Sequence, residues 1–198
     1  MNLPKIIAVD ANFLVAWVSP NTSADDKARM AYLFETAEKS RCKVVLPMPA
    51  VAEYLAGADM AGVESLNLLE RKTCILLGDF NRAAAFECAQ LDRAAMRGSE
   101  DKKDGSDAPW QKVKIDRQIV AIAKANGAGL VISRDKGVRN NALRVGMSAI
   151  KVEELELPMS ARQGKLALVE PEPRAATGKG QRKPTLTAVP KAGASEQG

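Results

Sequence analysis

Short, continuous runs of apolar residues constrain the fold of this chain more than any other feature. The four clearest runs span residues 6–9, 44–46, 75–77 and 130–132, and a weaker one spans 149–152. Such runs are typical of strands that are buried on both faces of a parallel sheet, since strands with one wet face alternate between apolar and polar residues instead.

Helical patterns separate these runs. They cover residues 24–40, a segment that begins near Pro49, a segment between residues 80 and 95, a segment from about residue 115 to 125, and residues 136–145. The segment between 80 and 95 has one apolar face, made by Phe80, Ala84, Cys88, Leu91 and Ala95. Strands that alternate with helices predict an α/β three-layer sandwich with a mostly parallel central sheet. The polar stretch 98–112 interrupts the pattern and is expected to form a surface loop.

The charge distribution divides the chain into a body, residues 1–160, and a tail, residues 161–198. Seven of the 29 Lys and Arg residues but only three of the 24 Asp and Glu residues lie in the tail, which therefore carries most of the net charge of +5. The tail also contains proline and lacks aromatic residues, so we expect it to be disordered. It is either a solvated extension or a basic arm that binds nucleic acid weakly and in a salt-sensitive manner.

Composition excludes several kinds of chemistry. The chain has no histidine, which rules out Ser-His-Asp and Cys-His triads and any zinc site with histidine ligands. Its three cysteines show no CxxC spacing, so they are interpreted as core residues of a protein in a reducing compartment. No signal peptide is evident, and no apolar run approaches the roughly 20 residues that cross a bilayer, so a cytoplasmic protein is expected.

Four acidic residues stand where an α/β fold collects functional groups. Asp10 ends the first apolar run, Asp135 closely follows the run 130–132, and Glu53 and Asp116 are expected near helix beginnings. If they cluster, two carboxylates ~4 Å apart repel by about 4 kcal/mol at an effective dielectric constant near 20. Mg²⁺ or Mn²⁺ would relieve that repulsion and could activate water for attack on a phosphodiester. The alternative is that these acids are solvated or cap helices.

Several segments of the chain form an ordered series: an opening strand with Asp10 and Asn12, the segment 48–55 (MPAVAEYL), the segments 115–123 and 127–135, and a close at 150–158. In this order and spacing they resemble the PIN domain, the ribonuclease fold of VapC-type toxins in toxin–antitoxin pairs. The resemblance covers about residues 5–157. The long stretch 98–112 and the basic tail depart from the commonest pattern of these toxins.

The resemblance implies that Asp10, Glu53 and Asp116 are the core ligands of Mg²⁺ or Mn²⁺ and that Asp135 completes the set. Asn12 and Ser133 would support these carboxylates. The implied activity is metal-dependent endoribonuclease cleavage of RNA. A toxin of this kind would be held inactive by an antitoxin protein, and related toxins are often homodimers.

Two assignments retain alternatives. Asp107 lies close enough in sequence to compete with Asp116, but an apolar helical face follows Asp116, whereas Asp107 lies in a loop sequence. Arg134, Lys136 and Arg139 flank Asp135 and are predicted to contact the RNA backbone, although surface charges beside an acidic site also occur without such a function.

Two other functions compete with ribonuclease activity. The first is a non-catalytic PIN-like module that binds nucleic acid or protein. Absence of one of the four acids would favour this function, but all four are present. The second is a phosphatase of the haloacid dehalogenase type, which also begins with an aspartate at a strand end. That enzyme class normally has a second aspartate two positions later, where this chain has Asn12.

Overall fold

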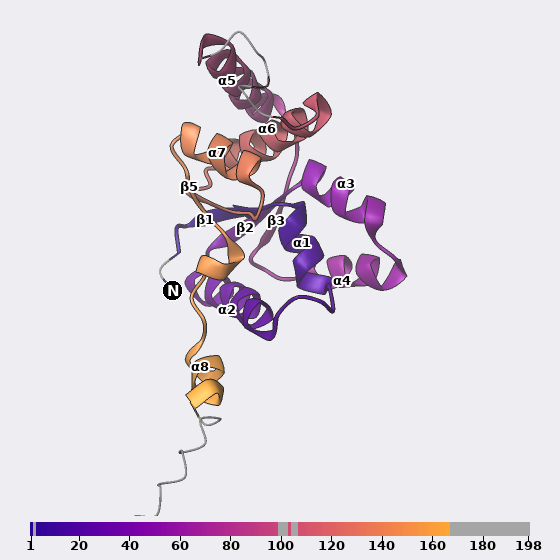
Figure 1. The fold of residues 1–198 in the computed structure, drawn as a ribbon, viewed down its shortest axis with the longest axis vertical. Coiled ribbons are helices and arrows are strands. Elements are labelled where there is room, and N and C mark those ends of the chain that lie inside the picture. Colours follow the sequence, from indigo (N-terminus) through magenta and orange to yellow (C-terminus); the bar gives the residue numbers. More distant parts are fainter. Residues whose placement is uncertain (2, 99–102, 104–106, 167–198) are drawn as a thin grey trace, which may run out of the picture.

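The fold is built on a five-stranded sheet in which all neighbouring strands are parallel (Figure 1). The computed structural model describes residues 1, 3–98, 103 and 107–166. The strands are β1 (Ile6–Val9), β2 (Lys43–Pro47), β3 (Ile75–Gly78), β4 (Leu130–Ile132) and β5 (Ser148–Ile150). They lie in the order β3-β2-β1-β4-β5. The predicted α/β class with a parallel central sheet is confirmed.

Helices connect the strands and cover both faces of the sheet. They are α1 (Ala11–Val18), α2 (Ala24–Ser40), α3 (Met48–Gly57), α4 (Met60–Glu70), α5 (Arg82–Gly98), α6 (Trp110–Ala125), α7 (Lys136–Arg144) and α8 (Met159–Leu166), with a 3₁₀ turn at Val152–Glu154. In the described part of the chain, none of them combines the length and the apolar character that a membrane-spanning helix requires.

The three layers follow from the alternation of side chains along each strand. In β1, Ile7 and Val9 pack with Phe13 of α1 and Phe34 of α2, whereas Ala8 between them packs on the opposite face with Ile119 of α6. Strands β2 and β4 divide their side chains in the same way. The three central strands β1, β2 and β4 are therefore buried on both faces, which is why their sequences show continuous apolar runs rather than alternation. The run 75–77 is an exception, because β3 lies at the edge of the sheet and leaves Leu76 and Leu77 exposed.

The strand order places a topological switch beside β1. The chain proceeds from β1 to β2 and β3 on one side, and then returns through α5 and α6 to place β4 on the other side of β1. Val9 pairs with Ile132 in the parallel register, so the carboxyl ends of β1 and β4 lie side by side. Ligand sites of open parallel sheets form at such a switch.

The structure corrects three details of the sequence interpretation. Helix α5 begins at Arg82, so Phe80 precedes it and is 45% exposed instead of contributing to its apolar face. Helix α6 begins at Trp110, directly after Pro109, so Lys112 is helical and the predicted loop ends earlier. Asp116 consequently lies in the second turn of α6 and not at its start.

Helices α1 and α4 were not predicted from the sequence, because each is short and its apolar pattern is brief. Helix α8 extends into the segment assigned to the tail, and residues 167–198 lie outside the described residues. The division of the chain into residues 1–160 and 161–198 stays a prediction.

We expect Gly78→Ala to destabilise the fold by about 1–3 kcal/mol, the usual cost of overpacking a core. A Cβ at the end of β3 would stand 2.6 Å from Ile122 Cγ2 and 2.9 Å from Val45 Cγ1. Urea unfolding of both proteins measures the difference. Gly57→Ala is the matched control, because a Cβ at the end of α3 meets nothing within 4 Å, and its stability should equal or slightly exceed that of the wild type. Equal stabilities of the Gly78→Ala variant and the wild type would contradict the packing described here.

Candidate active site

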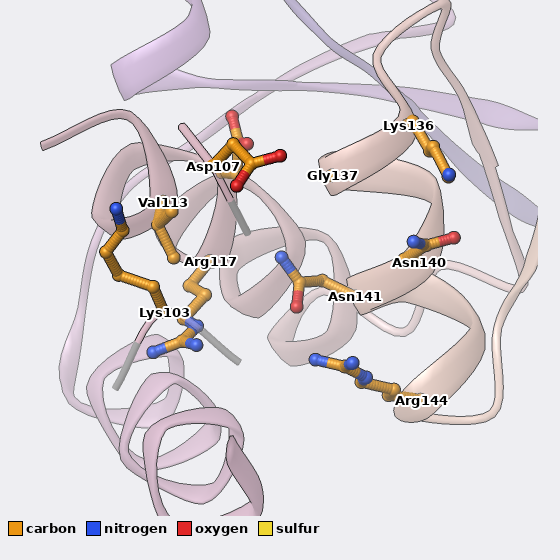
Figure 2. Close-up of a pocket in the computed structure, with 10 residues that line it drawn as sticks. Lys103, Asp107, Val113, Arg117, Lys136, Gly137, Asn140, Asn141 and Arg144 are labelled. Atoms are coloured by element: carbon orange, nitrogen blue, oxygen red, sulfur yellow. The ribbon is translucent and has the colours of Figure 1, made fainter. Parts of the chain in front are cut away.

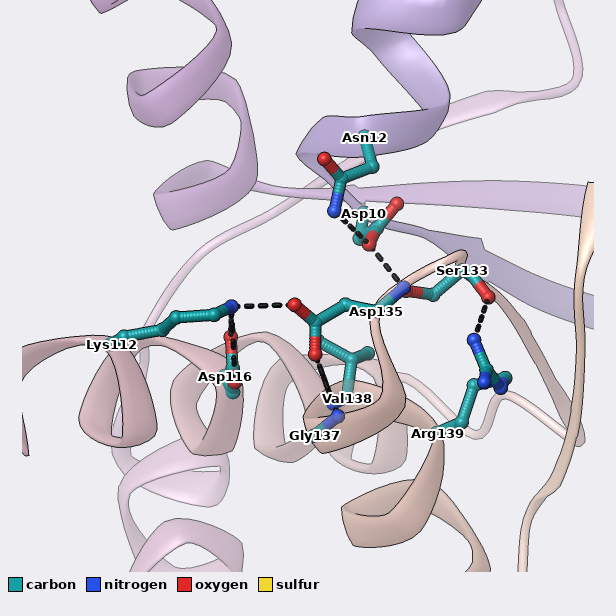
Figure 3. A network of polar contacts seen from close by, with 9 residues as sticks. All are labelled: Asp10, Asn12, Lys112, Asp116, Ser133, Asp135, Gly137, Val138 and Arg139. Carbon is teal, nitrogen blue, oxygen red and sulfur yellow. Dashed lines mark hydrogen bonds and ion pairs between the residues drawn. The ribbon is translucent and has the colours of Figure 1, made fainter. Parts of the chain in front are cut away.

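We call the end of the sheet near which Asp10, Glu53, Asp116 and Asp135 lie the acidic edge. Asp10 is its buried centre, with only 2% of its surface exposed. It directly follows β1 and is the N-cap of α1, where its Oδ1 accepts a hydrogen bond of 3.0 Å from the Phe13 amide. Its Oδ2 accepts hydrogen bonds from the hydroxyl of Ser133 and, at 3.4 Å, from the side-chain amide of Asn12. These contacts fix the carboxylate at the end of the strand (Figure 3).

Ser133 joins the ends of β1 and β4 through a single hydroxyl. Its Oγ donates to Asp10 and accepts a hydrogen bond of 2.9 Å from the Asp135 amide. Asp135 is in turn the N-cap of α7, where its Oδ1 accepts from the amides of Gly137 at 2.6 Å and Val138 at 3.3 Å. The other oxygen of Asp135, Oδ2, is left to face α6.

Lys112 connects Asp135 to Asp116. Its Nζ lies 2.6 Å from Asp135 Oδ2 and 3.3 Å from Asp116 Oδ1. Figure 3 shows the lysine reaching both carboxylates. Asp116 is one turn after Lys112 on α6 and is 6% exposed. The contact to Gly137 is so close that a Cβ there would lie 2.7 Å from Asp116 Oδ2. Glycine at the start of α7 therefore lets the two aspartates approach the same point.

The pKa values reflect this crowding of acids. Burial raises the pKa of Asp116 to about 6, and the charges of Asp135 and Glu53 act in the same direction, while Lys112 opposes them. Burial also raises the pKa of Asp10, against the hydrogen bonds from Ser133, Phe13 and Asn12. Burial favours the neutral form of Asp135 as well, but its bonds to Lys112 and to the α7 amides outweigh this and hold its pKa below the usual value.

The four predicted acids thus lie near the same edge but do not all touch. Asp135 influences both Asp10 and Asp116 electrostatically, and Glu53, exposed on α3, influences Asp116. Within the residues that the structure describes, no three Asp, Glu, Cys or His side chains are arranged closely enough to hold a metal ion.

The donor atoms of the four acids are nevertheless all oxygens, as Mg²⁺ and Mn²⁺ prefer. The ammonium of Lys112 bonded to two of them also indicates that a cation fits between α6 and Asp135. By its donor chemistry, the set suits such an ion.

The three basic residues near Asp135 differ in their contacts. Arg134 forms ion pairs of 2.8 Å with both Asp26 and Glu153. Arg139 donates to the carbonyl oxygen of Ser133 at 2.9 Å and so supports the turn that presents Asp135. Lys136 lines a pocket beside Asp116. Contact of these residues with RNA stays a prediction. Of the three, Lys136 is best placed for it, because it lines the pocket beside Asp116.

That pocket has a volume of about 330 Å³. It opens between the start of α6 and α7, and Figure 2 shows the residues that line it. Beside Lys136, α7 contributes Asn140, Asn141 and Arg144 to its lining, and α6 contributes Asp116 and Arg117. Asp107 lies at the same pocket, although no hydrogen bond or ion pair joins it to Lys112, Asp116 or Asp135 as these are described. Sequence reasoning missed both the pocket and Lys112.

Comparison with solved structures identifies the fold. The chain is similar to a chain of the VapBC2 complex of Rickettsia felis, solved with a DNA fragment from the promoter of its genes. The TM-score is 0.54 at 12% sequence identity, and the match covers 74% of this chain and 98% of that one. The chain has a PIN-domain, VapC-like fold. A second match, to DNA-bound VapBC of Salmonella typhimurium, has a TM-score of 0.47 at 16% identity and covers 74% and 97% of the two chains.

Sequence comparison alone does not reach this fold. No family model matches the chain, and no curated protein is similar to it. The recognition therefore depends on the order of its strands and helices and on short segments around the acidic edge. At such low identity the likeness to VapBC concerns the fold, and the chemistry of this chain must be argued from its own residues.

Proposed function

We propose that this chain is a metal-dependent endoribonuclease whose acidic edge holds Mg²⁺ or Mn²⁺. The observation that carries the proposal is the approach of Asp116 and Asp135 to a single cation, the Lys112 ammonium, next to the buried Asp10. These side chains come from α6, the end of β4 and the end of β1, at the topological switch where sites of such sheets form. A protein with no catalytic purpose has little reason to bury mutually repelling carboxylates there.

Asp10, Asp116 and Asp135 would be the ligands closest to the ion, with Glu53 approaching from α3. When bound, the ion supplies Lewis acidity and lowers the pKa of a water molecule. Ser133 and Asn12 hold the Asp10 carboxylate in one orientation through their hydrogen bonds. The amides of Gly137 and Val138 do the same for Asp135, so the donors are fixed before any substrate arrives.

The pocket beside Asp116 suits the strand that would be cleaved. Lys136 and Arg144 offer charge for phosphate oxygens, and Asn140 and Asn141 offer amides that hydrogen-bond to sugar or base edges. A nucleotide bound in this pocket would lie next to the acidic edge, because Asp116 is part of the pocket lining. An antitoxin protein that covers this edge and a homodimer of the chain are further parts of the proposal, supported by the VapBC complexes with which the fold is shared.

The experiment that tests this function is cleavage of a mixed RNA panel and of single-stranded DNA by the purified full-length chain. We expect cleavage of RNA with Mg²⁺ or Mn²⁺ and none with EDTA. Asp116→Asn should reduce the rate by more than about 100-fold. Even mutation of a residue that only supports a metal ligand typically lowers metal affinity or activity about 10- to 100-fold. Asp107→Asn, the alternative acid near the same pocket, should cleave like the wild type.

Two results would overturn the assignment. Cleavage that persists in EDTA or in the Asp116→Asn variant would show that the acidic edge does not perform the reaction. A folded wild type that binds Mn²⁺ but cleaves nothing in the panel, and whose RNA affinity is unchanged by Mn²⁺, would favour a binding module in place of an enzyme.

A further inference from the structure

Lys112 occupies an unusual position for a lysine. It is the third residue of α6, in the first helical turn, where the helix dipole disfavours positive charge. Its ammonium nevertheless points across to Asp135 and back to Asp116, and makes contacts of 2.6 and 3.3 Å. The attraction of two carboxylates must outweigh the unfavourable end of the helix.

The contact with Lys112 also stabilises the two carboxylates. Asp116 is buried and close to Asp135, so without a positive charge between them their repulsion would be only weakly screened. Lys112 supplies that charge, and in doing so it occupies the space toward which both carboxylates point. An ammonium and a divalent ion cannot share that space.

The lysine can also leave. Its side chain is 45% exposed, whereas that of Asp116 is 9% exposed. The four-carbon stem of a lysine reorients by rotating single bonds, and an ammonium is readily hydrated. The side chain can therefore turn to solvent from the first turn of α6 without movement of the helix or of the carboxylates.

We propose that Lys112 competes with a divalent metal ion for Asp116 and Asp135, so that the ion binds only when the ammonium leaves. This inference rests on the proposed function, in which these two aspartates are metal ligands. Lys112 is then an internal cation that holds the acidic edge together without metal and weakens metal binding. Its presence sets the concentration of Mg²⁺ or Mn²⁺ at which the site fills.

The test compares Lys112→Met with the wild type by calorimetric titration with Mn²⁺, using the full chain freed of metal. Methionine keeps an unbranched apolar stem like that of lysine and lacks the terminal ammonium. We expect the variant to bind Mn²⁺ about tenfold more tightly or better, because the ion no longer displaces a charge only a few ångströms from both ligands. Lys114→Met is the matched control. Lys114 is exposed on the same helix, and its loss should change the affinity by less than about twofold.

Thermal unfolding gives a second readout that does not depend on activity. In EDTA the Lys112→Met variant should melt below the wild type, because Asp116 and Asp135 face each other without a cation. Saturating Mn²⁺ should raise its melting temperature more than that of the wild type. A lysine that merely stabilised the fold would lower the melting temperature by the same amount in both conditions. Lys112→Gln, which is shorter and polar, repeats the comparison if the methionine variant folds poorly.

The outcomes separate this inference from the proposed function. Equal or weaker Mn²⁺ binding by Lys112→Met overturns the competition, even if the wild type cleaves RNA. Failure of both proteins to bind Mn²⁺ overturns it as well. Tighter binding by the variant supports the competition even if neither protein cleaves RNA, and the ribonuclease assignment then fails alone.

Discussion

Asparagine at position 10 is expected to reduce RNA cleavage by more than about 100-fold while the protein stays folded. Asparagine is a good N-cap, since its oxygen can still accept from the Phe13 amide. Its amide nitrogen takes the place of Oδ2 and can donate to the Ser133 hydroxyl, so the fold loses little. The negative charge that would hold the metal is removed. Single-turnover cleavage of the best RNA of the panel, with unfolding in urea as the companion measurement, tests both parts.

Alanine at the same position separates structure from chemistry. It would leave the buried Ser133 hydroxyl and the Phe13 amide without their acceptor, at a cost of about 1–3 kcal/mol in the free energy of unfolding. Asn12→Ala serves as a mild control, because its hydrogen bond to Asp10 is long, 3.4 Å, and a decrease in rate of less than about tenfold is expected. Retention of a tenth or more of the wild-type rate by Asp10→Asn would remove Asp10 from the site.

The second large effect concerns pH. The native pKa of Asp116, raised to about 6 mainly by burial, exceeds the usual aspartate value that the unfolded chain would show. The folded state therefore binds a proton more readily than the unfolded state. Without metal, the free energy of unfolding should rise as the pH falls from 7 toward 4, by at most about 3 kcal/mol. Asp10, whose pKa is also raised, acts in the same direction.

At lower pH the free energy of unfolding falls with falling pH instead of rising, because the pKa of Asp135 is depressed in the folded state. The stability that its ionised form contributes is lost as the pH falls below the usual value of 3.8 and through the native pKa. Urea unfolding between pH 3 and 8 in EDTA should therefore show a maximum near pH 4–5. The absence of histidine leaves few other groups that titrate between pH 5 and 7. Asp116→Asn should flatten the slope between pH 5 and 7, and an unchanged slope in that variant would contradict the assignment.

The sheet was predictable from the sequence, and the approach of the acids only in part. Runs such as residues 6–9 and 130–132 are buried on both faces, and their continuous apolar composition indicates this burial. Asp10 and Asp135 could be placed because residues that closely follow adjacent parallel strands share an edge. No rule of this kind places Glu53, which lies on a helix and is exposed, and its part in the site stays a prediction.

Lys112 was missed because the start of α6 was placed too late. With residues 98–112 assigned to a loop, its spacing of four from Asp116 carried no meaning, since residues four apart face each other only on a helix. Pro109 was the available signal, because proline is favoured at helix starts. The contact to Asp135, 23 residues away, depends on how α6 packs beside α7, and local sequence patterns do not determine that packing.

The hydrogen bond between Ser133 and Asp10 joins residues 123 positions apart, which has a consequence during translation. The first 98 residues, with β1, β2 and β3, can leave the ribosome while β1 still lacks its neighbour β4 and while Asp116 and Asp135 are not yet synthesised. Contacts between distant segments form late, because the whole loop between them must first be closed. A nascent chain therefore carries Asp10 without its partners, and the ribosome that makes this protein is not exposed to an assembled acidic edge until β4 and α7 have emerged and docked.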